Sequence, residues 1–270
     1  MSTIATIGNL AVDRIAGAPP RAGGGVFHAA RAAAHVRADA VAVTRCAPGD
    51  RATALAPLES LGLPVTCADA TETTAFSFHY EGDHRVMAVD AVGEPWTPED
   101  VEGWASAALD GAGWVLVAGL LRSHFPAPTI EALARGGRRL LLDAQGLVRL
   151  ARTGPLTRDG AFDREALRHL AVLKLNEDEG RILAGDLEPR ALRALGVPEI
   201  VLTLGSQGAL VVTSEGATRV DAQTVSGTVD PTGAGDAFSL VYVDGRAQGL
   251  GPVAAAERAA NAVAELISVR

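Results

Sequence analysis

The feature that most constrains the fold is a regular alternation of short apolar runs with segments of helical periodicity. Apolar runs at residues 114–118, 140–143, 172–175 and 200–204 have the length of buried strands. Segments with helical spacing lie between them, and glycine-rich turns mark many junctions. This alternation predicts an α/β fold with one parallel, doubly wound sheet covered by helices on both faces. No repeat or long linker divides the chain, so we expect a single domain over residues 1–270.

The N-terminal part of the chain begins with an apolar run at residues 4–9, which predicts a first strand. Asp13 follows it, where open α/β sheets place ligands, although a surface-loop aspartate is the plainer interpretation. Residues 23–25 are three glycines that precede a predicted helix at 26–36. They would serve either as a flexible connector or as a place where a substrate approaches the backbone. His28, in the first turn of this helix, is either a packed core histidine or a substrate contact.

One segment breaks the α/β alternation. Residues 73–80 alternate apolar and polar side chains with period two, residues 81–83 form a turn, and 85–89 return. This pattern predicts a hairpin with one apolar face. An inserted hairpin is typical of a lid or a dimer contact, with an edge ribbon as the alternative. Its apolar face should therefore cover the substrate or pair with another subunit, which would give a homodimer.

The stretch at residues 230–238, Asp-Pro-Thr-Gly-Ala-Gly-Asp-Ala-Phe, carries the strongest functional signal. Pro231 fixes φ, while Gly233 and Gly235 permit backbone angles closed to other residues. An apolar run follows and predicts a buried helix, whose N-terminus would offer backbone amides to an anion. Asp236 lies inside this anion site, which suits a transient phosphoryl group beside a proton acceptor. The alternative is a plain helix start with a stabilising acidic residue.

Composition and charge exclude several classes of protein. The net charge of −8 argues against a nucleic-acid-binding surface. Cys46 and Cys67 are too few for a disulfide framework or a metal cluster and suit a reducing compartment. No apolar run reaches membrane-spanning length and no leader precedes the first strand, so we expect a cytoplasmic protein. No lysine stands in a P-loop context.

The stretch at 230–238 resembles the second signature of the ribokinase-like (PfkB) carbohydrate kinases, and the resemblance extends over nearly the full chain. Residues 8–13 resemble the family's opening strand, 23–24 its first signature, 176–179 its Asn-x-x-Glu motif, and 203–208 its nucleotide loop. The resemblance implies a three-layer α/β/α fold with a mostly parallel central sheet and a small β-hairpin lid.

The resemblance also implies a role for each matching residue. The family's anion hole falls on Gly233, Ala234 and Gly235, and its general base on Asp236. Mg²⁺ would be held near Glu179 through water. Substrate contacts are implied for Asp13, Gly23, Gly24 and His28, the last standing where many members carry Asn, and nucleotide contacts for Asn176, Thr203, Gly205, Gly208 and Asn261.

Two departures from the family pattern stand out. Only about nine residues separate Asp13 from Gly23, where sugar kinases usually have a longer stretch with lid strands. We therefore expect the lid to be reduced to the hairpin at residues 73–89. In addition, residues 143–149 (Asp-Ala-Gln-Gly-Leu-Val-Arg) replace the usual Asp-x-Asn pattern and resemble the inositol-kinase branch of the family.

The predicted function is an ATP- and Mg²⁺-dependent kinase that phosphorylates a hydroxyl of a small neutral sugar or cyclic polyol, inositol included. A requirement for a monovalent cation such as K⁺ is left open. The alternative within the fold is a nucleoside kinase. A dinucleotide-dependent dehydrogenase is disfavoured because the glycine turn lacks the third glycine of that fingerprint. A non-catalytic ligand sensor is disfavoured because it has no need of a base at Asp236.

Overall fold

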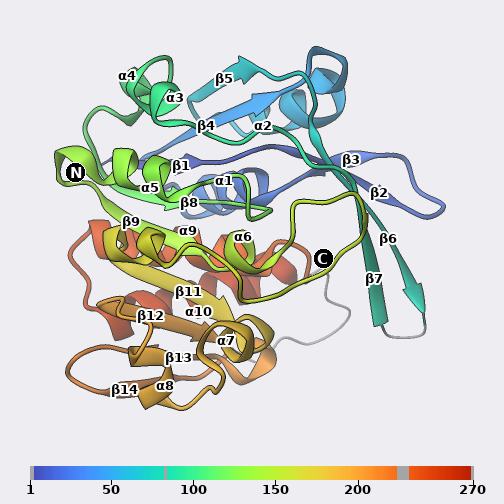
Figure 1. Cartoon of the computed structure of the whole chain (residues 1–270). Helices are drawn as coiled ribbons and strands as arrows, with labels where there is room; N and C mark the ends of the chain where they lie inside the picture. The colour runs from blue at the N-terminus through green and yellow to red at the C-terminus, as the bar shows by residue number, and fades with distance from the viewer. Residues whose placement is uncertain (1–2, 82–83, 224–230, 269–270) are drawn as a thin grey trace.

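The computed structural model describes residues 3–81, 84–223 and 231–268. Its main sheet has nine strands in the order β14-β13-β12-β11-β9-β8-β1-β4-β5 (Figure 1). From β12 to β5 in this order neighbouring strands pair in parallel, and β13 and β14 add an antiparallel edge. The strands are β1 (Thr3–Ile7), β4 (Ala40–Cys46), β5 (Val65–Asp69), β8 (Ala112–Val117), β9 (Arg139–Asp143), β11 (Val172–Asn176), β12 (Glu199–Thr203), β13 (Ala209–Val212) and β14 (Ala217–Val220).

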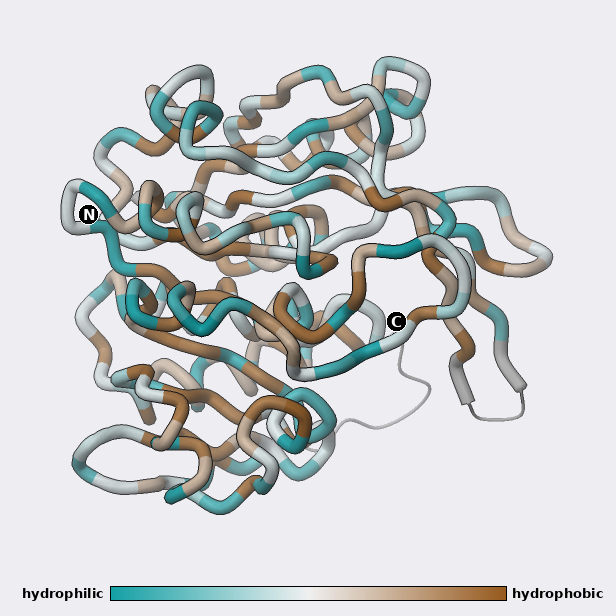
Figure 2. The backbone as a smooth tube through the Cα atoms, in the orientation of Figure 1, coloured by the Kyte–Doolittle hydropathy of each residue, from teal (hydrophilic) through white to brown (hydrophobic). Residues whose placement is uncertain are grey.

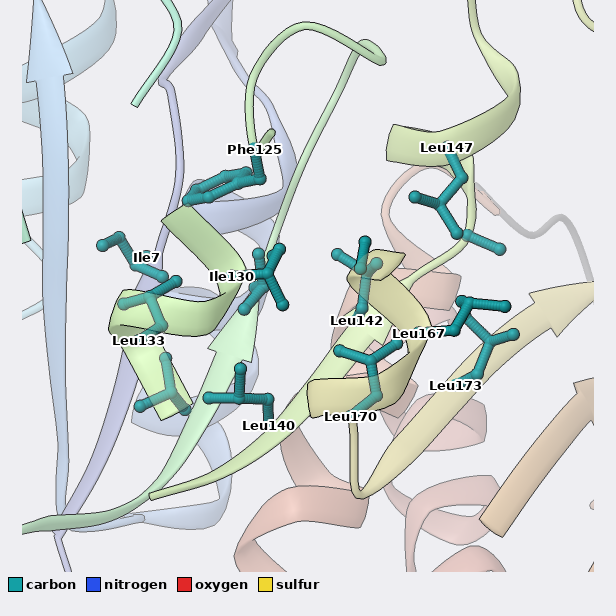
Figure 3. Packing of buried hydrophobic residues seen from close by; sticks show 14 of the residues in the cluster. Ile7, Phe125, Ile130, Leu133, Leu140, Leu142, Leu147, Leu167, Leu170 and Leu173 are labelled. Carbon is teal, nitrogen blue, oxygen red and sulfur yellow. The ribbon is translucent and has the colours of Figure 1, made fainter. Parts of the chain in front are cut away.

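Helices cover both faces of this sheet, as the alternation predicts. Successive strand residues point to opposite faces, so Leu140 and Leu142 join one core while Leu141 joins the other. Figure 3 shows the first core, where leucines of the sheet meet Ile130 and Leu133. Helices of this face are α3 (Pro98–Glu102), α4 (Ser106–Leu109), α5 (Ala127–Ala134), the 3₁₀ segment η4 (Arg164–His169), α7 (Glu177–Ala184) and α8 (Pro189–Arg193); the other face carries α1 (Gly25–Val36), α9 (Ala234–Ala247) and α10 (Pro252–Ile267).

Most apolar segments follow the strands of the main sheet, and the outer turns are more polar (Figure 2). The three-layer α/β/α fold expected from the sequence is thus confirmed. Two segments of helical spacing are interrupted. Residues 98–109 divide into α3 and α4 around Gly103, and residues 51–59 form a π-type turn (Arg51–Leu55) followed by α2 (Ala56–Glu59).

A second sheet has five strands in the order β10-β7-β6-β2-β3 and includes the predicted lid hairpin, so we call it the lid sheet. Figure 1 shows β2, β3, β6 and β7 extending from one side of the body. The expectation that the lid is reduced to a hairpin was wrong, because the short stretch from Asp13 to Gly23 itself contributes two strands. The lid strands are β2 (Ala11–Ile15), β3 (Arg21–Gly23), β6 (Thr74–Glu81), β7 (His84–Ala91) and β10 (Gly154–Pro155).

The predicted hairpin is present as β6 and β7, and its apolar face packs within the chain. Phe76 and Val89 are buried with Leu120 and Leu121 of the body. Among the described residues, Val86 is the one large apolar side chain that is exposed. The apolar character of the hairpin is therefore explained by contacts with its own body, and a homodimer through the lid stays a prediction. No helix within the described ranges is long and apolar enough to span a bilayer.

Candidate active site

The glycine turn before α9 is built from two local constraints. Gly233 has φ 78° and ψ 5°, the angles of the third residue of a type II turn, which favour glycine. The Ala234 amide closes this turn by donating to the Pro231 carbonyl oxygen at 3.1 Å. Asp230, the first residue of the predicted stretch, lies outside the described residues.

The turn changes which amides can form the anion hole. Because the Ala234 amide is engaged, its expected contact with a phosphoryl group is not supported. The amides of Gly235 and Asp236 have no partner among the described residues. They belong to the first turn of α9, a helix of 14 residues, where free amides and the helix dipole favour an anion.

His28 supports this turn from α1. A Cβ atom at Gly233 would lie 2.2 Å from His28 Cγ, so the imidazole ring packs directly against the glycine. The side chain is 9% exposed. His28 thus packs under the glycine turn, and it also lines two pockets beside α1, so the contact with substrate implied by the resemblance stays a prediction.

Asp236 follows the glycine turn and contacts two other segments of the chain. Its Oδ1 accepts a hydrogen bond from Gln145 Nε2 at 3.3 Å, and a Cβ at Gly25 would approach the same oxygen to 2.8 Å. Gln145 begins the short helix α6 (Gln145–Val148), just after β9. Burial and the nearby Asp143 carboxylate raise the pKa of Asp236 to about 7. A carboxylate with this pKa is suited to accept a proton near neutral pH.

A buried ion pair packs against the glycine turn. Lys174 Nζ donates to Asp143 Oδ2 at 2.9 Å, and both side chains are almost fully buried. A Cβ at Gly235 would lie 2.8 Å from Lys174 Nζ, so the ammonium group is packed against the turn. Burial, the largest single effect, opposes the charge of Lys174, but Asp143, Glu179 and Asp236 together outweigh it and raise the pKa of the lysine. Lys174 is the only lysine of the 270 residues, and sequence reasoning missed its role.

A pocket of about 760 Å³ opens beside Lys174 and the signature turn. Asn176, Thr203, Gly205 and Gly208 all line it, as expected for nucleotide contacts. The apolar part of the wall comes from Phe238 of α9 and from α10. We call this cavity the donor pocket; its α10 residues are Ala260, Val263, Ala264 and Ile267.

Asn261 does not belong to the donor pocket. It is exposed and absent from the lining, whereas Ala260 and Ala264 face the cavity. One residue along an α-helix turns a side chain by about 100°, which takes Asn261 to another face of α10. The expected contact of Asn261 with a nucleotide is therefore not supported.

The Asn-x-x-Glu motif forms a capping box at the start of α7. Asn176 Oδ1 accepts from the Glu179 amide and Glu179 Oε2 accepts from the Asn176 amide, each at 2.9 Å. Glu179 is buried, and burial raises its pKa. No group of three or more acidic, histidine or cysteine side chains in the described ranges could hold a metal ion by itself. The residues fit an Mg²⁺ ion that keeps water and phosphate oxygens as its main ligands.

The predicted acceptor residues meet on the opposite side of Asp236. Asp13, on lid strand β2, is 6% exposed, and a Cβ at Gly23 would lie 2.5 Å from its carboxyl carbon. Gly24 has φ 91° and caps α1. Gly25 lies against Asp236. The glycine run therefore contacts Asp13 at Gly23 and the expected base at Gly25. The structure thus brings together Asp13, the glycines and Asp236, which lie far apart in sequence.

Comparisons with known proteins agree with this geometry. The family model of the pfkB family carbohydrate kinases matches residues 20–269. Over 103 residues the chain is 38% identical to a 2-dehydro-3-deoxygluconokinase of Thermoproteus tenax, a match that spans 37% of this chain and 31% of that relative.

Two solved structures share the whole fold. A pyrophosphate-dependent kinase in the ribokinase family, complexed with a pyrophosphate analog and myo-inositol, superposes with a TM-score of 0.84 at 22% identity, covering 98% of this chain and 94% of that one. Arabidopsis thaliana ribokinase with ribose and ATP gives a TM-score of 0.76 at 19% identity, covering 100% and 93%. The ribokinase-like fold is therefore shown along the chain. With its family model matched over nearly all residues, the chain belongs to the pfkB family of carbohydrate kinases, phosphotransferases with a hydroxyl acceptor.

Proposed function

We propose that the protein transfers the terminal phosphoryl group of ATP to a hydroxyl of a small neutral sugar or cyclic polyol, with Asp236 as general base. The observation that carries this proposal is the position of Asp236. Its carboxylate lies next to Gly25, in the glycine run that leads to Asp13, and the residue belongs to the first turn of α9, whose Gly235 and Asp236 amides have no partner among the described residues. A hydroxyl bound beside Asp13 would thus have a proton acceptor and an anion hole on its path.

The reaction needs little covalent help from the protein. The acceptor oxygen attacks phosphorus as its proton passes to Asp236, and the bond to the bridging oxygen of ADP breaks. Amides of Gly235 and Asp236, with Lys174 behind them, stabilise charge on the transferred oxygens. Asn176 and Glu179 would hold Mg²⁺ through water, and the ion would supply positive charge against the donor phosphates.

ATP is favoured as donor by the apolar wall of the donor pocket. Pyrophosphate has no apolar part, whereas Phe238 and the small side chains of α10 offer a surface for a nucleobase. The relative that is named pyrophosphate-dependent makes pyrophosphate the necessary comparison. If pyrophosphate supports faster transfer than Mg-ATP, the donor part of the proposal is wrong.

The acceptor is proposed from Asp13. An ionised carboxylate accepts two hydrogen bonds from neighbouring hydroxyls, which suits a polyhydroxylated ring. Myo-inositol, bound by one structural relative, is such a ring. A nucleoside kinase is the alternative, since a riboside presents the same pair of hydroxyls.

The test is product formation across a matrix of donors and acceptors. Mg-ATP and Mg-pyrophosphate are each combined with myo-inositol, ribose, a nucleoside, 2-dehydro-3-deoxygluconate and a sugar phosphate, with and without K⁺. We expect ATP-dependent phosphorylation of a neutral ring. Clear preference for an acidic acceptor or a sugar phosphate would contradict the proposed acceptor class, and no transfer to any hydroxyl would contradict the proposed function.

A further inference from the structure

Arg149 is a cation beside the proposed reaction site, and its side chain has no partner within residues 3–81, 84–223 and 231–268. Its Nε atom is buried and makes no hydrogen bond. No hydrogen bond or ion pair joins its guanidinium to any residue in the described ranges. A half-buried arginine that stays unpaired loses hydration without compensation, so its position calls for an anionic ligand.

The surroundings of Arg149 are acidic. Burial lowers the pKa of the arginine and the charge of Arg158 adds to this effect, while Glu179, Asp143 and Asp236 oppose it. Asp143 is already matched by Lys174 in a direct ion pair. Arg149 is therefore the cation that remains to balance the negative charges of Glu179 and Asp236.

The fold places Arg149 near the base and near one wall of the donor pocket. Its amide donates to the Gln145 carbonyl oxygen, and the Gln145 side chain holds Asp236. On the other side, α6 packs against α7, whose first turn contains Glu179. The neighbouring Asn176 and Glu177 line the donor pocket. Arg149 is therefore close to both ends of the path from this pocket to Asp236, since its charge interacts with Glu179 and with Asp236.

We propose that Arg149 binds the oxygens of the transferring phosphoryl group, as a second source of positive charge opposite the amides of the α9 turn. This inference rests on the proposed function. A guanidinium offers parallel N–H donors that match two phosphoryl oxygens, which a lysine cannot reproduce. Lys174 and Arg149 would thus differ in role, since the first is fixed by Asp143 and the second is free for the substrate.

The test compares Arg149→Gln with Arg158→Gln. Arg158 forms an antiparallel bridge with Arg149 but its own guanidinium pairs with Asp178 at 3.2 Å, so it is a matched control. For each variant, calorimetry gives the affinity for Mg-ADP and for Mg-ADP with aluminium fluoride, a mimic of the transferring group, in the presence of the acceptor used by the wild type. Steady-state kinetics give kcat and the acceptor KM.

We expect Arg149→Gln to bind Mg-ADP within about threefold of wild type. Its affinity for the aluminium fluoride complex should fall at least tenfold, and kcat should fall about 10²-fold, as on loss of one oxyanion donor. Arg158→Gln should keep both values. Arg149→Lys, which keeps the charge but not the planar fork, should lie between wild type and Arg149→Gln, and it replaces the glutamine variant if that one does not fold.

Two results would overturn the inference. Unchanged affinity for the aluminium fluoride complex in folded Arg149→Gln would show a charge-balancing role only. A raised acceptor KM with kcat preserved would show that Arg149 binds an anionic group of the acceptor instead. A wild-type protein that transfers to no acceptor would contradict the proposed function itself, a failure distinct from either of these.

Discussion

The two sides of Asp236 are built in different ways. The donor side is an open pocket of backbone amides, glycines, small apolar side chains and one lysine. The acceptor side is formed by side chains of a second sheet, because Asp13 belongs to lid strand β2 and is buried against Gly23. Amides and apolar walls recognise features that all nucleoside triphosphates share. Side chains of the lid sheet are instead free to differ between proteins, so acceptor choice should depend on the lid.

The largest effect is expected where the two sides meet. Asp236→Asn keeps the size of the side chain but removes the proton acceptor, so kcat should fall by at least ~10²-fold. Affinity for Mg-ATP should be preserved, because the amides of the α9 turn remain. Steady-state kinetics and nucleotide titration check both values, and near-wild-type turnover would contradict the assignment.

The stability of this variant separates catalysis from helix capping. The pKa of Asp236 is raised to about 7 in the folded protein, so the carboxylate contributes less stability as pH rises toward and through 7. Asn cannot ionise, and Asp236→Asn should therefore melt no lower than wild type at pH 8. A loss of about 0.3–1 kcal/mol would instead fit a helix-stabilising acid.

The donor side is tested through its lysine. Lys174→Met alone would leave the buried Asp143 carboxylate unpaired and could unfold the protein, so it is combined with Asp143→Asn. We expect the double variant to fold and to lose roughly 10²-fold in kcat/KM for ATP, since a positive charge at the wall of the donor pocket is removed. Asp143→Asn alone is the control. Equal activity of the double variant and this control would exclude Lys174 from donor binding.

The acceptor side is tested through a single methyl group. In Gly23→Ala the new Cβ would lie 2.5 Å from the Asp13 carboxyl group and displace it. The acceptor KM should rise roughly tenfold while the KM for ATP stays unchanged. Gly49→Ala is the matched control, because no atom lies within 4 Å of its added Cβ. An increase in the KM for ATP instead would contradict the separation of the two sides.

Much of the main sheet could be predicted from the sequence because its strands are buried on both sides and appear as continuous apolar runs. The lid strands β2 and β3 are short and follow β1 almost directly, so periodicity does not separate them. The turn residues Gly17, Pro19 and Pro20 between them were the available signal.

The site residues, too, divide into those that could be predicted from the sequence and those that could not. Motifs fixed by backbone geometry, such as the turn at Gly233 and the capping box at Asn176, could be located from residue types alone. Asn261 could not be oriented from sequence, since neighbouring positions on α10 point in different directions. The role of Lys174 was missed, although a lone lysine inside an apolar strand was a usable signal. Which amides of the glycine turn remain free depends on a hydrogen bond that no residue pattern shows.

The central claim is that Asp236 accepts the proton of the acceptor hydroxyl, and the pH dependence of single-turnover phosphoryl transfer from Mg-ATP tests it most directly. Burial and Asp143 hold the pKa of Asp236 at about 7, and the base must be ionised to act. The rate constant should therefore rise about tenfold per pH unit below 7 and level off above it. The residual rate of Asp236→Asn should lack this dependence. A wild-type rate that stays flat between pH 5.5 and 8, or the same rising limb in Asp236→Asn, would contradict the account.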